Sequence, residues 1–280
     1  DNSQNQKGYT PPAIKLSSDV MTPEVLWSFG RIGNVSVSPD GSKAVYDITY
    51  FNKEEDRGYS DLYLMNLPEG QTTRLTDTDY NESDAGWTPD GKFITYLAKG
   101  QLWEMNPDGS NPRQVTDIPD GINGYVYAPD MSKIVYLKDV QLEPTVQDLY
   151  PDLPKAKARI VDDQFYRHWN DWVDAYTHLF IADYVPAQPI TTGKDIMEGE
   201  RWESPVRPWG GVEQLAWTKD GKKLIYTCRK KIGIDYAEST NTDLYAYNTE
   251  NGETVNLTEG MMGYDKNPVI SPNGRYMAWE

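Results

Sequence analysis

The chain contains very little cysteine or histidine. Among its 280 residues there are one cysteine, Cys228, and two histidines, His168 and His178. A single cysteine cannot form an internal disulfide, and two histidines without a cluster of cysteines do not provide a zinc site. We therefore expect no metal and no cofactor.

Basic residues and long apolar runs are also scarce. The sequence has 27 Lys and Arg against 43 Asp and Glu, which gives a formal charge of −16. Nucleic acids and anionic membranes bind basic surfaces, so neither is an expected partner. The apolar runs are only a few residues long and cannot cross a bilayer. Nine Trp and 20 Tyr supply enough buriable surface to exclude a disordered chain.

What the sequence does contain is a repeat. Five segments combine alternating strand residues, a tight turn and a second strand that is rich in aromatic residues. An Asp-Gly or Asn-Gly pair supplies the positive φ angles of a hairpin turn, and proline before it ends the first strand. The five segments are Val35–Tyr46, Ala85–Tyr96, Tyr125–Tyr136, Leu215–Tyr226 and Val269–Trp279.

Most of these units continue with two more predicted strands. The third strands are Asp61–Met65, Gln101–Met105, His178–Ala182 and Asp243–Tyr247. The fourth strands are Thr73–Thr76, Arg113–Thr116, Pro189–Thr192 and Thr254–Thr258. Repetition of a four-stranded unit predicts an all-β fold, a β-propeller of TolB- or WD40-like blades. The alternative is a β-sandwich with coincidental Pro-Asp-Gly turns, which does not explain the shared register of the five units.

The spacing of the turns indicates where the domains and the insertion lie. Successive turn residues are separated by 50, 40, 90 and 53 positions, and three of these intervals fit one blade. The long interval predicts a blade with an insertion at about 138–176. Residues 1–31 are expected to form an N-terminal segment with a short helix, capped by Thr22 and ended by Gly30. Residues 32–280 are expected to form the blades.

Both ends of the chain suggest further expectations. Residues 1–7 are polar, as in a mature N-terminus after export or in a trimmed chain, and export predicts a periplasmic or secreted protein. The final residues, up to Glu280, have the pattern of a strand interior. An open propeller would leave strand edges unpaired, so we expect the propeller to be incomplete here and more chain to follow.

The sequence lacks the motif of a serine hydrolase. A nucleophile elbow requires Gly-x-Ser-x-Gly, and no such pentapeptide is present. The nearest segment, Gly58–Leu62, lacks the second glycine. No catalytic residue is therefore assigned, and these 280 residues are not expected to catalyse hydrolysis alone.

The predicted insertion contains the best candidates for a binding site. Its sequence from Asp162 to Asp174 places aromatic residues beside carboxylates, a combination that binds cations through cation–π contacts and ion pairs. Alternatively, the aromatic residues only pack the inserted hairpin onto its own blade. The candidate substrate-binding residues are Asp162, Asp163, Arg167, His168, Trp169 and Asp171.

Taken together, the Ser-Pro-Asp-Gly blades, the Thr-Pro-Glu-x-Leu-Trp helix and the Phe-Tyr-Arg-His-Trp insertion resemble a known family. They are similar to the N-terminal propeller of prolyl oligopeptidase-family serine peptidases, particularly bacterial dipeptidyl-peptidases and acylaminoacyl peptidases. The resemblance implies a propeller that caps a C-terminal α/β-hydrolase domain and admits only short peptides. It also implies that acidic side chains of an insertion hold the substrate's ammonium group, a role we assign generally to Asp162, Asp163 and Asp171.

Two functions remain open at this point. The first is the substrate-gating propeller of a peptidase that cleaves short peptides near their N-termini. Its partners would be peptides and its own α/β-hydrolase domain, and a homodimer is compatible with it. The second is a non-enzymatic, TolB-like propeller that acts as a protein-binding scaffold, which leaves the insertion without a purpose.

Overall fold

The computed structural model describes residues 8–163 and 166–280. The polar residues 1–7, on which the expectation of export rests, lie outside the described residues, as do Gln164 and Phe165 of the insertion. The chain divides into two compact units. The first contains residues up to Gly121 together with Val185–Thr191, and the second contains Ile122–Tyr184 and Thr192–Glu280.

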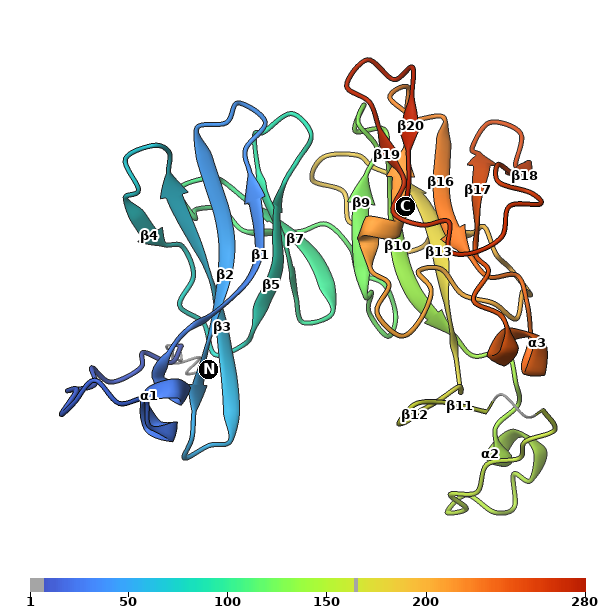
Figure 1. Cartoon of the computed structure of the whole chain (residues 1–280), viewed down its shortest axis with the longest axis horizontal. Coiled ribbons are helices and arrows are strands. Elements are labelled where there is room, and N and C mark those ends of the chain that lie inside the picture. Colours follow the sequence, from blue (N-terminus) through green and yellow to red (C-terminus); the bar gives the residue numbers. More distant parts are fainter. Residues whose placement is uncertain (1–7, 164–165) are drawn as a thin grey trace. The chain divides into compact units, whose positions relative to one another are not determined.

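The first unit consists of one short helix and two antiparallel sheets, each of four strands in sequence order (Figure 1). Helix α1 (Pro23–Ser28) forms as expected: the Thr22 hydroxyl caps it by accepting a hydrogen bond from the amide of Val25, and proline occupies its first position. The strands of the first sheet are β1 (Arg31–Val37), β2 (Lys43–Asn52), β3 (Arg57–Asn66) and β4 (Thr72–Arg74). Those of the second are β5 (Glu82–Trp87), β6 (Ile94–Ala98), β7 (Gln101–Met105) and β8 (Arg113–Gln114).

Outside the insertion, the second unit has two further four-stranded antiparallel sheets and a two-stranded hairpin, β19 (Val269–Ile270) and β20 (Met277–Ala278). One sheet has the order β9 (Gly124–Tyr127), β10 (Lys133–Val140), β13 (Tyr176–Asp183), β14 (Lys194–Asp195). The other has the order β15 (Leu215–Trp217), β16 (Lys223–Cys228), β17 (Asp243–Asn248), β18 (Thr254–Asn256). A 3-10 turn (Val212–Gln214) precedes β15, and α3 (Gly233–Glu238) lies between β16 and β17. The repeated four-stranded sheet confirms the predicted blade.

One predicted strand is wrong. The fourth strand of the third blade was expected at Pro189–Thr192, but the structure places it at β14. Ile190 instead pairs with the outer end of the second blade: its amide donates to the carbonyl of Val115 and its carbonyl accepts from Asp117, both at 2.8 Å. Periodicity along the chain identified an extended segment here, but it could not tell which sheet that segment joins.

The repeated turns share one mechanism. In the first, the Asp40 carboxylate accepts hydrogen bonds from the Ser38 hydroxyl (2.6 Å) and the Ser42 amide (3.0 Å). The Ser38 hydroxyl and then the Ser42 amide lower the pKa of Asp40 to about 2. The same pattern recurs at Asp90, Asp220 and Asn273. Asp130 accepts from the amide and the hydroxyl of Ser132 instead, because Ala128 has no hydroxyl. The next residue has a positive φ in all five turns and is glycine in four of them.

The exception is Met131, which adopts φ 58° where the other turns have glycine. A left-handed conformation costs a side-chain-bearing residue about 1–2 kcal/mol, while glycine gains freedom in the unfolded chain. We expect Met131→Gly to stabilise the protein by about 0.5–1 kcal/mol, measured as a higher Tm. The converse change, Gly41→Met, should lower Tm because a methionine at this φ angle (72°) is strained. The effect isolates the backbone conformation, since nothing lies within 4 Å of the added Cβ. A lower Tm for Met131→Gly would contradict this explanation.

Candidate functional site

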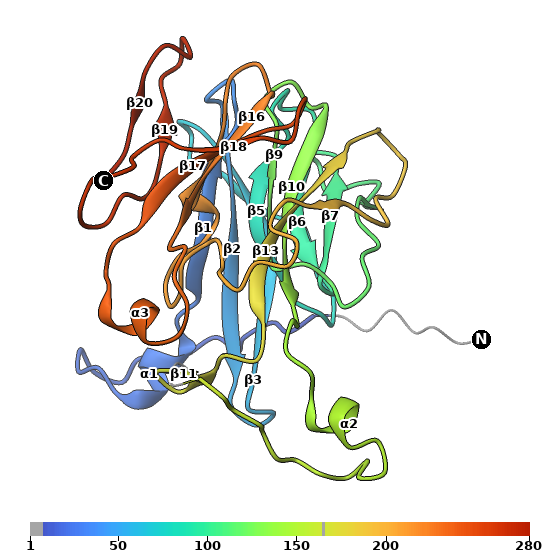
Figure 2. The same ribbon diagram turned by 90° about the vertical axis from the view of Figure 1, so that its right-hand side faces the viewer.

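Within the second unit, the insertion begins at the end of β10 and ends at the start of β13. It contains α2 (Val146–Leu149) and the hairpin of β11 (Arg167–His168) and β12 (Asp171–Trp172), which lie beyond one end of the sheets of that unit (Figures 1 and 2). A capping box starts α2: the Thr145 hydroxyl accepts from the Asp148 amide (3.2 Å), and the Asp148 carboxylate accepts from the Thr145 amide (2.7 Å). The start of α2 is therefore fixed by its own local sequence.

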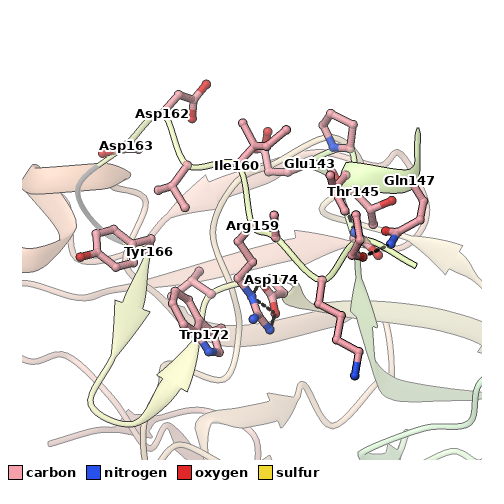
Figure 3. Close-up of a pocket in the computed structure, with 18 of the residues that line it drawn as sticks. Glu143, Thr145, Gln147, Arg159, Ile160, Asp162, Asp163, Tyr166, Trp172 and Asp174 are labelled. Atoms are coloured by element: carbon pink, nitrogen blue, oxygen red, sulfur yellow. Dashed lines mark hydrogen bonds and ion pairs between the residues drawn. The ribbon is translucent and has the colours of Figure 1, made fainter. Parts of the chain in front are cut away.

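The insertion lines most of an open cavity of about 490 Å³. Figure 3 shows residues of α2, of the segment 156–163 and of the hairpin around it. Arg201, which follows β14, completes the lining. This volume is in the range of small-molecule and peptide sites.

Two ion pairs join residues that line this cavity. The guanidinium of Arg159 binds the carboxylate of Asp174 through two nitrogens, with Nε–Oδ1 at 3.0 Å and Nη2–Oδ2 at 2.8 Å. This contact lowers the pKa of Asp174. Arg201 Nε lies 2.9 Å from Glu143 Oε1 and so connects the start of the insertion to its own blade. Both pairs are partly exposed, so they determine geometry more than stability.

An aromatic residue lies beside the first of these ion pairs. The guanidinium carbons of Arg159 and Arg167 are 4.3 and 4.9 Å from the centre of the Trp172 ring, and Tyr166 stacks on the same ring at 6.0 Å. Trp172 therefore already has cationic partners within the insertion.

A second, much smaller chamber of about 30 Å³ adjoins the cavity and shares Asp163, Val173, Tyr176 and Arg201 with it. Its remaining walls come from the hairpin, the segment after β14 and α3: His168, Trp202, Glu203, Arg207, Lys231, Ile232, Gly233 and Tyr236. This volume accommodates about one water molecule.

Buried charges line the small chamber. Glu203 is 5% exposed; its Oε2 lies 2.8 Å from Arg207 Nε, and its Oε1 accepts a hydrogen bond from the Tyr236 hydroxyl at 3.0 Å. Burial raises the pKa of Glu203, while Arg207 and Tyr236 oppose the rise. The pKa of His168 is lowered by burial and by the positive charges of Arg229 and Arg207, with Asp171 acting in the opposite direction. Burial and the two neighbouring guanidinium groups therefore favour the uncharged imidazole.

The structure brings together only part of the predicted site. Asp162 and Asp163 line the large cavity, and Asp163 and His168 line the small chamber. Arg167, Trp169 and Asp171 are described but are outside both sets of lining residues. Trp169 is 70% exposed at the turn of the hairpin, and its ring meets Trp209 edge to face at 5.3 Å. Among the described aromatic residues of this segment, Tyr166 contacts Trp172, Trp169 contacts Trp209, and all three of Tyr166, Trp169 and Trp172 are exposed.

Sequence reasoning missed the residues that support the insertion from its blade. These residues, which lie 30 or more positions after Asp171, the last of the predicted residues, are Arg201, Glu203, Arg207 and Tyr236. A signal was present in Arg201-Trp-Glu-Ser-Pro, where a carboxylate stands beside tryptophan and proline.

In the part of the chain that the structure describes, no three His, Cys, Asp or Glu side chains gather closely enough to hold a metal ion. Its helices are also too short or too polar to cross a membrane.

Comparison with known proteins identifies the class of fold. The structure resembles acylaminoacyl peptidase of Pyrococcus horikoshii, with a TM-score of 0.59 and 16% identity over 86% of this chain and 34% of that one. It also resembles TolB of Acinetobacter baumannii, with a TM-score of 0.50 and 16% identity over 89% of this chain and 48% of that one. At this identity the likeness shows the fold alone, and the fold is a β-propeller.

Sequence similarity is more specific. The chain is 42% identical over 273 residues to dipeptidyl-peptidase 5 of Porphyromonas endodontalis, a match that covers 96% of this chain and 39% of that protein. The expected resemblance to the propeller of dipeptidyl-peptidase-like members of the prolyl oligopeptidase family is confirmed. The chain spans about two fifths of the length of the curated relatives it matches. No family model matches it.

Proposed function

We propose that this chain is the substrate-gating propeller of a serine peptidase that removes short fragments from the N-termini of peptides. The observation that supports this most directly is the 42% identity with a dipeptidyl-peptidase along 96% of the chain. The nucleophile would come from an α/β-hydrolase part outside these 280 residues, in keeping with the missing Gly-x-Ser-x-Gly motif. The likeness to TolB concerns the fold only and does not favour a binding scaffold.

The insertion is the part of the chain that would bind the peptide. The carboxyl side chains of Asp162 and Asp163 line its cavity of about 490 Å³, in which the guanidinium of Arg159 is paired with Asp174. A peptide's N-terminal ammonium group would be attracted to these carboxylates. The preference for a free N-terminus would then come from the propeller and not from the catalytic part.

The test is the double variant Asp162→Ala/Asp163→Ala in the full-length enzyme. We expect KM for free-amine peptides to rise about tenfold, equivalent to about 1.4 kcal/mol, because one charge-assisted contact is lost. Cleavage of N-acylated peptides should be nearly unchanged because they have no ammonium group. Steady-state kinetics on both substrate types provides the measurement.

A matched control removes two neighbouring carboxylates elsewhere. Glu54→Ala/Glu55→Ala changes the net charge equally in the turn between β2 and β3, outside the lining of the cavity. It should leave both substrate types unaffected. If the Asp162/Asp163 variant affected cleavage of both substrate types equally, the role of these residues in binding the ammonium group would be refuted. If the unchanged full-length protein had no peptidase activity, the proposed function itself would be refuted.

A further inference from the structure

The β11–β12 hairpin contributes a side chain to the lining of each of the two cavities. Arg167 pairs with Trp172 and His168 pairs with Asp171 across the hairpin, and cross-strand partners share a face. Trp172 lines the large cavity, whereas His168 lines the small chamber. The position of this two-pair hairpin therefore determines the shape of both cavities.

One loop of the same unit, residues 203–211, meets the hairpin at its tip and its base and lines the small chamber together with His168. At the tip, Trp209 meets Trp169 with ring centres 5.3 Å apart and planes at 86°. Glu203 and Arg207 are the residues of the loop that line the chamber with His168. At the base, Arg207 Nη2 donates a hydrogen bond to the carbonyl of Ala175 (3.1 Å), just before the chain enters β13.

This loop is itself held in place by buried contacts. Besides its ion pair with Arg207, Glu203 accepts a hydrogen bond from the Arg207 amide at 3.3 Å. Further along, the Val206 amide donates to the Gln214 side chain at 2.8 Å, and the Gly210 amide donates to the Val206 carbonyl at 3.0 Å. A Cβ on Gly210 would lie 2.5 Å from that carbonyl, so the turn is tightly packed.

The contacts at the tip and at the base differ in nature. The Glu203–Arg207 pair is largely removed from water, where a carboxylate without its cation is unfavourable, so the pair resists separation. The two indoles at the tip are 70% and 77% exposed. Their contact buries little surface, but it joins the end of the hairpin to the loop.

We propose that the 203–211 loop is a clamp that positions the β11–β12 hairpin, with Glu203, Arg207 and Trp209 as positioning residues for the peptide site. The clamp fixes the face that carries Trp172 and thereby the width of the large cavity. The proposal rests on the proposed function for its consequence in substrate binding. The clamping itself concerns only contacts within the second unit.

The experiment compares Trp209→Ala and Glu203→Gln with the unchanged full-length protein. Hydrogen exchange is followed in the peptide that contains the Val173 amide, which donates to the Tyr166 carbonyl across the hairpin at 3.0 Å. We expect exchange there to accelerate about tenfold or more in both variants, because the hairpin opens more often. KM for free-amine peptides should rise about threefold or more, while kcat should stay within about twofold. The reason is that the variants weaken substrate binding but do not affect the chemical step.

Each variant has a control with a matched contact in the first unit. Trp27 meets Phe51 edge to face at 5.2 Å, so Trp27→Ala removes a similar aromatic pair. Glu104 is buried and lies 2.9 Å from Arg113 Nε, so Glu104→Gln removes a similar buried charge. Neither control should change exchange in the hairpin or KM.

The outcomes separate the clamp from the proposed function. Exchange within about twofold of the unchanged protein in both variants would overturn the clamp. Faster exchange with unchanged KM would support the clamp and refute the role of the insertion in peptide binding. If Glu203→Gln does not fold, Trp209→Ala decides the question, since its side chain is mostly exposed.

Discussion

Replacing Leu224 by alanine is expected to destabilise the second unit by about 3–4 kcal/mol, a large fraction of the stability of a typical domain. Leu224 lies in β16 and is fully buried. Its cluster joins side chains from both four-stranded sheets of that unit, among them Val135, Leu179 and Trp217. Removing three carbon atoms here loses their burial and leaves a void that neighbours on two sheets cannot both fill.

The measurement is calorimetric unfolding, in which the transition of the second unit should fall by about 10 °C. Leu257→Ala is a suitable control, because Leu257 is exposed in the same unit and its truncation should cost less than about 1 kcal/mol. A loss below about 1 kcal/mol for Leu224→Ala would mean that the two sheets do not share a tightly packed core.

A second large effect is expected from pH in the first unit. Glu82 in β5 is almost completely buried, and its carboxylate accepts hydrogen bonds from the hydroxyls of Thr78 (2.8 Å) and Thr76 (3.2 Å). Burial raises its pKa to about 7, above the ordinary value of 4.5, although the Thr78 hydroxyl opposes the rise and Asp61 adds to it. The folded chain therefore holds this proton more tightly than the unfolded chain does.

Stability from this group is fully present below about pH 4.5 and is lost as the pH rises through about 7. We expect the first unit to lose about 2–3 kcal/mol from this source between pH 4.5 and pH 8. Glu82→Gln, which keeps an uncharged side chain at every pH, should be more stable than the unchanged protein at pH 8 and similar to it near pH 4.5. Denaturant unfolding at several pH values provides the measurement.

Other buried carboxyls of this unit titrate as well, since burial also raises the pKa values of Asp47 and Asp61. The difference between the Glu82 variant and the unchanged protein isolates one group from this background. Glu69→Gln, at an exposed position of the same unit, should leave the pH dependence unchanged. Identical slopes for Glu82→Gln and the unchanged protein would disprove the assignment.

The blade repeat was predictable because its causes are local. Proline before the turn, Asp40 and its equivalents within it and alternating residues after it each act over a few positions. The same locality explains the one wrong strand: Ile190 has an extended pattern, but its partner Val115 lies in another blade. The capped helix α1 was predictable for the same reason.

The candidate site was predictable only in part. Asp162, Asp163 and His168 line cavities. They could be predicted because the insertion that contains them is recognisable as the non-repetitive part of the sequence. The pairing of Arg159 with Asp174 and the exposure of Trp169 were not visible in the order of residues. Glu203 and Arg207 were missed because they follow β13 and β14 in the chain. Only the folding of these strands brings them beside His168 of the hairpin.

By itself, then, the sequence determined the repeated four-stranded unit, the interrupted blade and the family resemblance, because turns, caps and strand alternation depend on near neighbours. Only the tertiary structure decided which sheet Ile190 joins, which charges are buried in pairs, and how the 203–211 loop meets the hairpin. These are contacts between segments far apart in the chain. Their geometry depends on packing and desolvation, which linear order does not specify.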